Sequence, residues 1–176
     1  MAVTINASTT SGLVMTSDLS GVLTLQQNGV SLPNGGVAPA FSAYQSTLQS
    51  VSNGTATKVQ FQNKDFDTNS NYDNATNYRF TPTVAGYYQI NASVQITSTT
   101  ASIVAFIYKN GTQYAVGGVG SFASGAINTV SQVACLMFFN GSTDYAEIYV
   151  LQASGISQNT GASNATRFNG SLVRGA

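Results

Sequence analysis

Residues 78–97, YRFTPTVAGYYQINASVQIT, carry the clearest structural pattern in this chain. From Tyr88 onward apolar and polar residues alternate, which is typical of a β-strand with one buried face and one polar face. Pro82 and Gly86 indicate a tight turn before this strand, so the segment is predicted to form a hairpin, with a strand, a tight turn and a second strand. The side chains expected in the core are Tyr88, Ile90, Val94 and Ile96.

Short strands are predicted on both sides of this segment, and no part of the chain shows a helical period. Asn110-Gly111 predicts a hairpin between 102–109 and 113–116, because both turn residues tolerate a positive φ. Residues 63–77 and 153–166 are polar and are expected to be irregular. The other predicted strands are 41–48, 58–61, 129–139, 144–152 and 167–173. Short strands at regular spacing predict an all-β fold, an antiparallel two-sheet jelly-roll sandwich.

Three predicted strands, 102–109, 129–139 and 144–152, are apolar on both faces. A strand of an antiparallel sandwich usually buries only one face, so these strands need a second surface that covers them. A subunit interface is the simplest such surface. The candidates for core or subunit-interface residues are Phe61, Tyr88, Phe106, Tyr108, Phe138, Tyr145 and Tyr149.

Charged residues make up only 7% of the 176 residues, and six basic side chains balance six acidic ones. The sequence therefore has no basic footprint for nucleic acid or for an anionic membrane surface. Its longest apolar run, residues 133–139, is too short to span a membrane, and residues 1–4 lack the features of a secretory signal. Few charges give little protection against association, so we expect the protein to work in an assembly.

The sequence offers no recognisable catalytic residues. It contains no histidine, which removes the Ser-His-Asp and Cys-His arrangements, and Cys135 stands alone in an apolar strand. Asp144 and Glu147 are three residues apart on a predicted strand, so they point to opposite faces and do not form an acid/base pair. We expect no enzymatic activity and no cofactor.

One polar segment resembles a calcium loop, because oxygen-bearing side chains occur at every second position. These residues are Asp65, Asp67, Asn69, Asn71 and Asp73. However, Ser70 stands where the helix-loop-helix calcium motif needs glycine, and Thr76 where it needs a bidentate glutamate. A surface loop rich in Asx turns is the preferred interpretation, and calcium binding is the minor alternative.

Several short motifs occur in order along residues 40–176. They are Phe41-Ser42-Ala43-Tyr44, Val59-Gln60-Phe61, Tyr72-Asp73, Tyr78-Arg79-Phe80, Pro82-Thr83-Val84-Ala85-Gly86-Tyr87-Tyr88, Lys109-Asn110-Gly111 and Phe168-Asn169-Gly170-Ser171-Leu172. Together they resemble the globular head of complement component 1q and, through it, the tumour-necrosis-factor-like jelly roll. The resemblance implies a non-enzymatic domain that forms a tight homotrimer.

Residues 1–36 are predicted to be an extended N-terminal arm, and residues 37–39 a linker to the jelly roll at 40–176. The runs 12–14 and 21–25 resemble the opening of many tailed-phage virion proteins. The apolar side chains of the arm lie in strands too short to fold alone, so we expect them to order against another virion protein. These docking candidates are Ile5, Leu13, Met15, Leu23 and Leu25.

The leading hypothesis is a phage structural protein on the virion surface, a homotrimeric knob that decorates or cements the capsid. Its partners would be two further copies of itself and, through the arm, the major capsid protein or another virion protein. The alternative is the receptor- or glycan-binding knob of a short tail fibre. In that case the loops 63–77 and 153–166 would bind a host-surface glycan.

Overall fold

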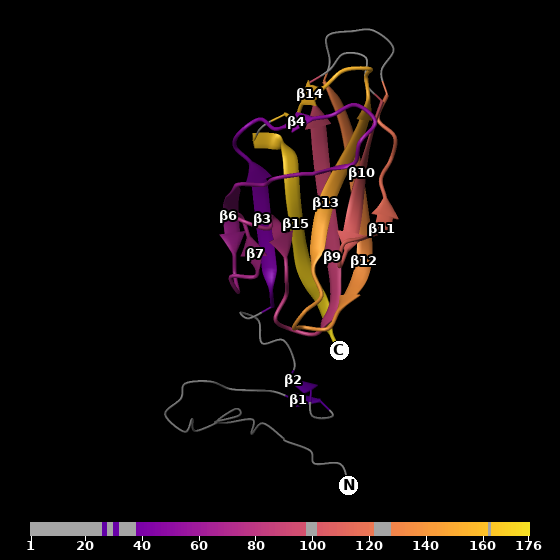
Figure 1. Cartoon of the computed structure of the whole chain (residues 1–176). Helices are drawn as coiled ribbons and strands as arrows, with labels where there is room; N and C mark the ends of the chain where they lie inside the picture. Colours follow the sequence, from indigo (N-terminus) through magenta and orange to yellow (C-terminus); the bar gives the residue numbers. More distant parts are fainter. Residues whose placement is uncertain (1–25, 28–29, 32–37, 98–101, 122–127, 162) are drawn as a thin grey trace, which may run out of the picture.

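The chain folds as two antiparallel β-sheets packed face to face (Figure 1). The computed structural model describes residues 26–27, 30–31, 38–97, 102–121, 128–161 and 163–176. The predicted all-β two-sheet sandwich is confirmed. The described residues contain no helix that could cross a membrane.

The first sheet, called here the β9 sheet, has five strands in the order β12-β9-β15-β3-β6. Their bounds are β12 Thr129–Phe139, β9 Gly86–Ile96, β15 Ser163–Gly175, β3 Ala40–Gln45 and β6 Asn63–Asp67. β9 pairs with β12 along its whole length and with β15 on its other side, which places it inside the sheet.

The second sheet, called the β13 sheet, has the order β11-β10-β13-β8-β7, and β5 also pairs with β13. Its strands are β11 Thr112–Val116, β10 Ser102–Lys109, β13 Ala146–Ala153, β8 Arg79–Phe80, β7 Tyr72–Asp73 and β5 Thr57–Lys58. Two small pairs complete the structure: β4 Ser50–Val51 with β14 Gln158–Asn159, and β1 Gln26–Gln27 with β2 Val30–Ser31. The last pair is the described part of the N-terminal arm.

The alternation predicted for β9 is confirmed, since Tyr88, Ile90, Val94 and Ile96 are all fully buried. They pack in a core rich in aromatic rings from both sheets. The Phe41 ring stacks on Phe80 at 4.3 Å between centroids and meets the edge of Phe168 at 4.8 Å. This interlocked group fixes how the two sheets lie on each other.

The predicted Asn110-Gly111 hairpin is also confirmed. Asn110 has φ 51° and Gly111 has φ 77°, and the turn joins β10 to β11. Positive φ at both central residues matches the right-handed twist of the flanking strands.

Residues 78–97 do not form one hairpin, and that prediction was wrong. β8 pairs with β7 and β13, whereas β9 belongs to the other sheet. The connection 81–85 therefore crosses between the sheets. The crossing brings Phe80 and Tyr88 into the core from opposite sides, with their ring centroids 5.7 Å apart.

The polar segment 63–77 is more regular than its composition predicted. It contains β6 at the edge of one sheet and β7 at the edge of the other. Charged side chains such as Lys64 and Asp65 suit an edge strand, because they oppose pairing with another chain. Part of the other polar segment, 153–166, is likewise in strands, namely β14 and the start of β15.

The arm joins the sandwich at the same end as the C-terminal part of β15. The Leu172 backbone N–H donates to the Pro39 carbonyl at 2.9 Å, and Ser171 is paired with Ala40. The β4–β14 pair lies at the opposite end (Figure 1). We call the first the base and the second the distal end. The docking candidates Ile5, Leu13, Met15, Leu23 and Leu25 fall outside the described residues.

Candidate assembly surface

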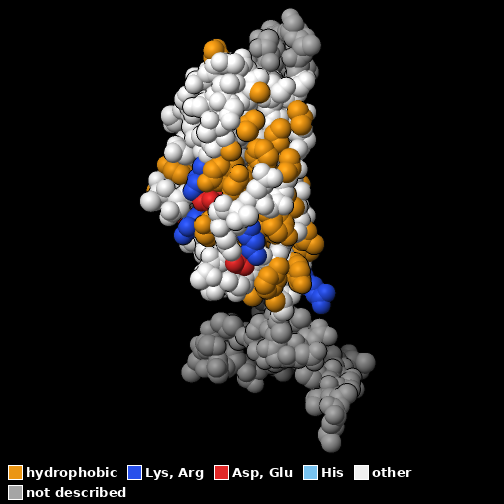
Figure 2. All heavy atoms as spheres, turned by 45° about the vertical axis from the view of Figure 1, so that its right-hand side comes forward, with side chains coloured by type: hydrophobic (Ala, Val, Ile, Leu, Met, Phe, Trp, Pro, Cys, Tyr) orange, Lys and Arg blue, Asp and Glu red, His pale blue; other side chains and the backbone are white. Residues whose placement is uncertain are grey.

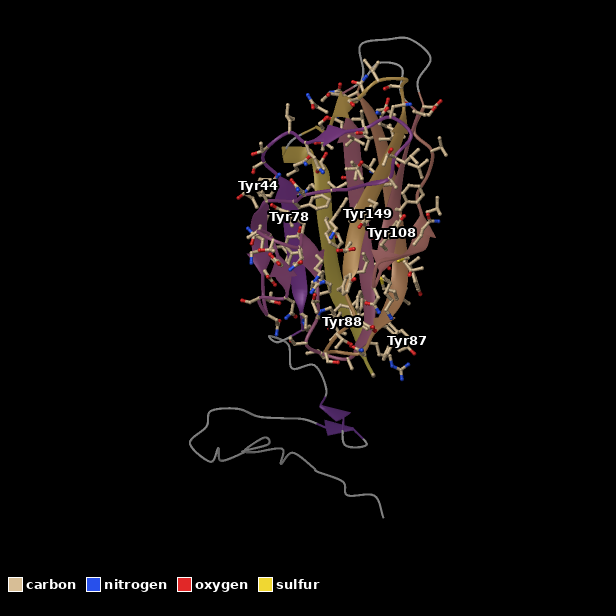
Figure 3. The ribbon with its side chains drawn as sticks, viewed as in Figure 1. Tyr44, Tyr78, Tyr87, Tyr88, Tyr108 and Tyr149 are labelled. Atoms are coloured by element: carbon tan, nitrogen blue, oxygen red, sulfur yellow. The ribbon has the colours of Figure 1, made fainter. Side chains whose placement is uncertain are left out.

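The outer side of the β9 sheet carries an exposed apolar patch near the base. Tyr87 and Phe138 are paired across β9 and β12, their rings lie 5.5 Å apart, and they are 45% and 40% exposed. Leu136, two residues along β12, is 53% exposed. Figure 3 places Tyr87 at the base, near the C-terminus. We call Tyr87, Leu136 and Phe138 the base patch. Water is an unfavourable neighbour for these rings, so the patch favours a protein contact.

The same face becomes polar toward the distal end. Gln89 Nε2 donates to Asn91 Oδ1 at 3.0 Å, and Asn91 Nδ2 donates to Asn169 Oδ1 at 3.1 Å. Asn91 and Asn169 border an open depression between β9, β12 and β15 that Gln132 and Arg167 also line. A face with apolar side chains at one end and a depression ringed by amides at the other can hold a protruding segment of another chain.

A second apolar surface follows the sandwich edge formed by β11, the segment after it and β12. Tyr114, Val116 and Val119 are 52%, 58% and 68% exposed, and Val130 on β12 is 36% exposed. Figure 2 shows hydrophobic side chains along this side of the molecule. We call these four residues the apolar edge.

Glycines allow the backbone to close this edge. The Gly117 N–H donates to the Ala105 carbonyl and the Gly118 N–H to the Gln132 carbonyl, which ties β10 to β12 across the two sheets. A Cβ atom on Gly117 would lie 2.5 Å from the Gln132 carbonyl oxygen, so a side chain would push the sheets apart there. The segment after β11 is therefore held against both β10 and β12.

Most charges near these surfaces are paired within the chain. The ion pairs are Lys58–Glu147, Lys64–Asp67, Lys109–Asp144 and Arg167–Asp65. Among the described residues, Arg79 and Arg174 have no acidic partner, and Arg79 lies 4.3 Å above the Tyr145 ring. Arg174 is paired with Tyr87 across β15 and β9, so one exposed cation without an acidic partner borders the base patch.

The structure separates the seven predicted core or interface residues. Phe61 and Tyr88 are in the core, and Phe138 belongs to the base patch. Phe106, Tyr108 and Tyr149 are half-buried on the outer side of the β13 sheet, and half-buried Tyr145 precedes β13. Sequence reasoning missed Tyr87, Leu136, Tyr114, Val116 and Val119. The sequence feature that could have identified them is an apolar side chain on the polar side of an alternating strand or beside a glycine-rich turn.

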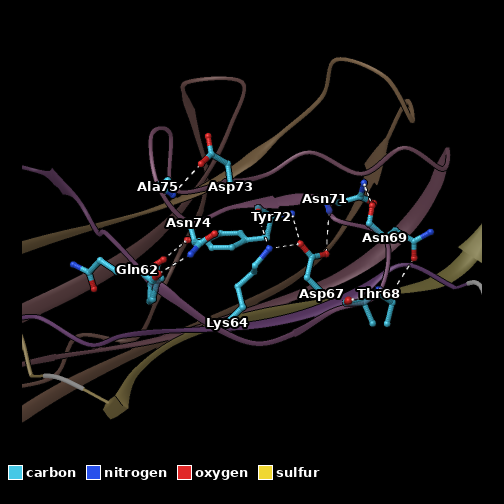
Figure 4. A network of polar contacts seen from close by, with 12 residues as sticks. Gln62, Lys64, Asp67, Thr68, Asn69, Asn71, Tyr72, Asp73, Asn74 and Ala75 are labelled. Atoms are coloured by element: carbon cyan, nitrogen blue, oxygen red, sulfur yellow. Dashed lines mark hydrogen bonds and ion pairs between the residues drawn. The ribbon is translucent and has the colours of Figure 1, made fainter.

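The carboxylates of the calcium-like segment have separate partners (Figure 4). Asp65 pairs with Arg167 and accepts a hydrogen bond from Ser42, whereas Asp67 accepts the Asn71 and Tyr72 backbone N–H groups at 3.0 Å. Asp73 accepts backbone N–H groups of the next turn, chiefly from Thr76 and Ala75, which holds its pKa well below the usual range. Among the described residues, no three of the acidic or cysteine side chains converge on one point.

We predict that Asp67→Ala destabilises the protein equally with and without calcium. The side chain of Asp67 is 4% exposed, and its loss would leave two backbone N–H groups and Lys64 without their acceptor. A decrease of about 1–3 kcal/mol in the free energy of unfolding is expected. Thermal melts in calcium at about 5 mM, above the weakest protein affinities, should match melts in chelator. A calcium-dependent rise in Tm that Asp67→Ala abolishes would contradict this interpretation.

The residues considered above for catalysis are Asp144, Cys135 and Glu147, and each lies in surroundings typical of a structural residue. Asp144 accepts a hydrogen bond from Asn110 and pairs with Lys109, which lowers its pKa. Burial raises the pKa of the Cys135 thiol, which disfavours the reactive thiolate. Glu147 pairs with Lys58 on β5. The partners of Asp144, Lys109 and Asn110, lie instead at the end of β10 and in the turn after it.

No protein-family model matches the sequence, and no curated protein matches it. Solved structures do match. The globular domain of zebrafish complement 1qA is 16% identical, with a TM-score of 0.52, over 78% of this chain and 99% of that one. Eiger TNF from S. frugiperda is 11% identical, with a TM-score of 0.57, over 79% and 94%. PRD1 vertex protein P5 is 15% identical, with a TM-score of 0.58, over 80% and 100%. The chain therefore has the complement-1q/TNF-like jelly-roll fold.

Proposed function

We propose that this protein is a non-enzymatic structural protein of a phage virion, a homotrimeric knob on the virion surface that decorates or cements the capsid. The observation that carries the proposal is the match to PRD1 vertex protein P5, which extends over 100% of that chain. The arm at the base of the sandwich and the two apolar surfaces support it.

The trimer forms when the apolar edge of one copy packs on the base patch and depression of the next. The edge and the face are different surfaces, so the contact is heterologous, and three such contacts close a ring. Closure leaves no free apolar edge, which suits a chain with 7% charged residues. The homotrimer is also what the resemblance to the complement head implies.

We assign attachment of the knob to the virion to the base of the sandwich. Residues 38–40 leave the sandwich beside the end of β15, so the arms of a trimer start from one end of the knob. The arm would bind the major capsid protein or another virion protein, by adding a strand to a sheet edge or by insertion between subunits. The distal end would then face away from the particle.

Deleting residues 1–36 tests this division of labour. We expect the truncated knob to keep its oligomeric state and its Tm, and to lose binding to particles assembled without the protein. Cosedimentation with such particles measures the binding. Leu48→Asp is the matched control, because Leu48 is exposed on the loop after β3 and the variant retains the arm.

Two results would contradict the assignment. If the truncated knob still cosediments with particles, the jelly roll itself attaches. If truncation dissociates the trimer, the arm is part of the subunit interface.

The tail-fibre alternative depends on ligand binding by the loops 63–77 and 153–166. In the first loop the polar side chains serve the loop itself, since Asp67, Asn71 and Asp73 hydrogen-bond within it or to Thr83. These bonds leave fewer groups for a ligand, so the capsid knob is the preferred proposal.

A further inference from the structure

Val119 stands out from the apolar edge as a single apolar side chain between two glycines. It is 68% exposed, the largest exposed fraction among the four residues of that edge. The Gly118 N–H donates to the Gln132 carbonyl at 3.0 Å, and Gly120 exchanges backbone hydrogen bonds with Ile103. The backbone is therefore held to β12 on one side of Val119 and to β10 on the other, and the flanking glycines have no side chain to cover it.

The depression on the outer side of the β9 sheet has a low floor and a polar rim. Two rows of side chains cross β12, β9 and β15 there. The first row is Gln132, Ser93 and Arg167, and the second, one step nearer the base, is Ala134, Asn91 and Asn169. Because Ser93 and Ala134 are small, the surface is lowest beside them, and it can receive a side chain that projects from another copy.

Val119 and the depression lie at the same height, measured along the strands from the base. Gly118, next to Val119, is bonded to Gln132, and Gln132 is in one row with Ser93. In the proposed knob all the arms leave from one end, so the rotation axis runs along the sandwich. Rotation about such an axis leaves the height of every residue unchanged. When the edge of one copy meets the β9 sheet of the next, Val119 is therefore level with Ser93.

A second pair of surfaces matches in height as well. Lys109 is paired with Thr112 at the start of β11, and its ammonium group donates to the Phe138 carbonyl at 2.7 Å. The start of β11, which carries Tyr114, thus lies near the height of the base patch. The rotation that brings Val119 to the depression also brings Tyr114 to the base patch, so that apolar side chains meet there.

The polar groups of the depression suit this occupant. Arg167 is already paired with Asp65, so an apolar side chain meets no unpaired charge there. Asn91 Nδ2 donates to Asn169 Oδ1, and within the described part of the chain Asn169 Nδ2 has no acceptor. Among the same residues the Val119 backbone carbonyl has no donor. The free amide can donate to this carbonyl when the contact excludes water.

We propose that Val119 of one copy inserts into the depression of the next, beside Ser93, and that this contact sets how the subunits are aligned in the ring. The inference rests on the proposed homotrimer. It adds the residues that meet at each of the three equivalent contacts.

Disulfide trapping tests the contact. In the variant Val119→Cys/Ser93→Cys, oxidation should link each copy to the next and give a product of three chains on a denaturing gel without reductant. β12 lies between the two positions within one copy, so the bond should form between copies. Val119→Cys/Gln89→Cys is the matched control. Gln89 is on the same strand and face but four residues, or about 13 Å, closer to the base, which is too far for a disulfide. It should give about tenfold less linked product.

A second variant does not depend on cysteine chemistry. Val119→Lys would place a cation beside Arg167 of the next copy, and it should raise the concentration at which the trimer dissociates about tenfold or more. Ile156→Lys is the control, because Ile156 is 66% exposed in the connection between β13 and β14. It should dissociate as the wild type does. Both side chains are outside the core, so neither change should affect folding.

Light scattering before oxidation separates failure of this contact from failure of the trimer. A trimer that does not link through Val119→Cys/Ser93→Cys, or that links equally well through the control pair, would overturn the contact and leave the trimer standing. A Val119→Lys trimer as stable as the wild type would do the same. A wild-type monomer would overturn both.

Discussion

Phe41→Ala should lower the free energy of unfolding by about 3–5 kcal/mol, the range for a large aromatic side chain removed from a core. Phe41 is 1% exposed and contacts three other rings, Tyr72, Phe80 and Phe168, from both sheets. The resulting cavity would lie where the sheets are held together, so little collapse around it is possible. Domains of this size are stable by only about 5–15 kcal/mol, so the variant should melt at a far lower denaturant concentration.

Phe66→Ala is the matched control for this prediction. Phe66 lies on β6 in the strand pair that contains Phe41, but its side chain is 51% exposed. Its removal should change stability by less than about 0.5 kcal/mol. Both variants are compared in denaturant melts at one fixed protein concentration, because unfolding of an oligomer depends on concentration. Similar losses at both positions would mean that the core is not centred on Phe41.

The wild-type protein should have three times the chain mass of 18.3 kDa by gel filtration with light scattering at micromolar concentration, and Leu136→Asp should reduce it to the mass of one chain. Leu136 lies in the base patch, where the proposed trimer buries it against the next copy. An aspartate there would be a charge without a partner in a dehydrated contact, repeated once in each subunit. The far-ultraviolet spectrum should stay unchanged, because the side chain is outside the core.

Leu48→Asp provides the comparison, since Leu48 and Leu136 are both 53% exposed but lie on different surfaces. This variant should remain trimeric. A wild-type monomer would contradict the trimer itself. A Leu136→Asp trimer would contradict only its geometry, and the interface would then have to be sought on another face.

The local patterns in the sequence predicted local structure well. The alternation in β9 identified its buried face, and Asn110-Gly111 identified the β10–β11 turn. Both patterns depend only on the preferences of a few neighbouring residues. They can therefore be predicted without knowing where distant parts of the chain lie. The same reasoning wrongly joined residues 79–80 to β9, because alternation does not determine which sheet a strand joins.

The strands with two apolar faces show a further limit. Their second faces were interpreted together as one subunit interface. β10 and β12 are in different sheets, however, so their outer sides face away from the sandwich in opposite directions. A subunit contact that covers Phe138 on β12 cannot also cover Phe106 and Tyr108 on β10, because they lie on the opposite side of the sandwich. Sequence alone could not separate these surfaces, because it does not show which sheet each strand joins.

The position of β15 affects how the chain can fold during its synthesis on the ribosome. β15 follows every other strand that the structure describes, yet it lies inside the β9 sheet, between β9 and β3. Until it emerges from the exit tunnel, β9 and β3 each lack a neighbour, and the Phe41 ring lacks Phe168. Pairing that spans almost the whole domain is slow, because a long loop must close first. The nascent chain therefore exposes two open strand edges until β15 has emerged, a state in which neighbouring nascent chains and chaperones compete for them.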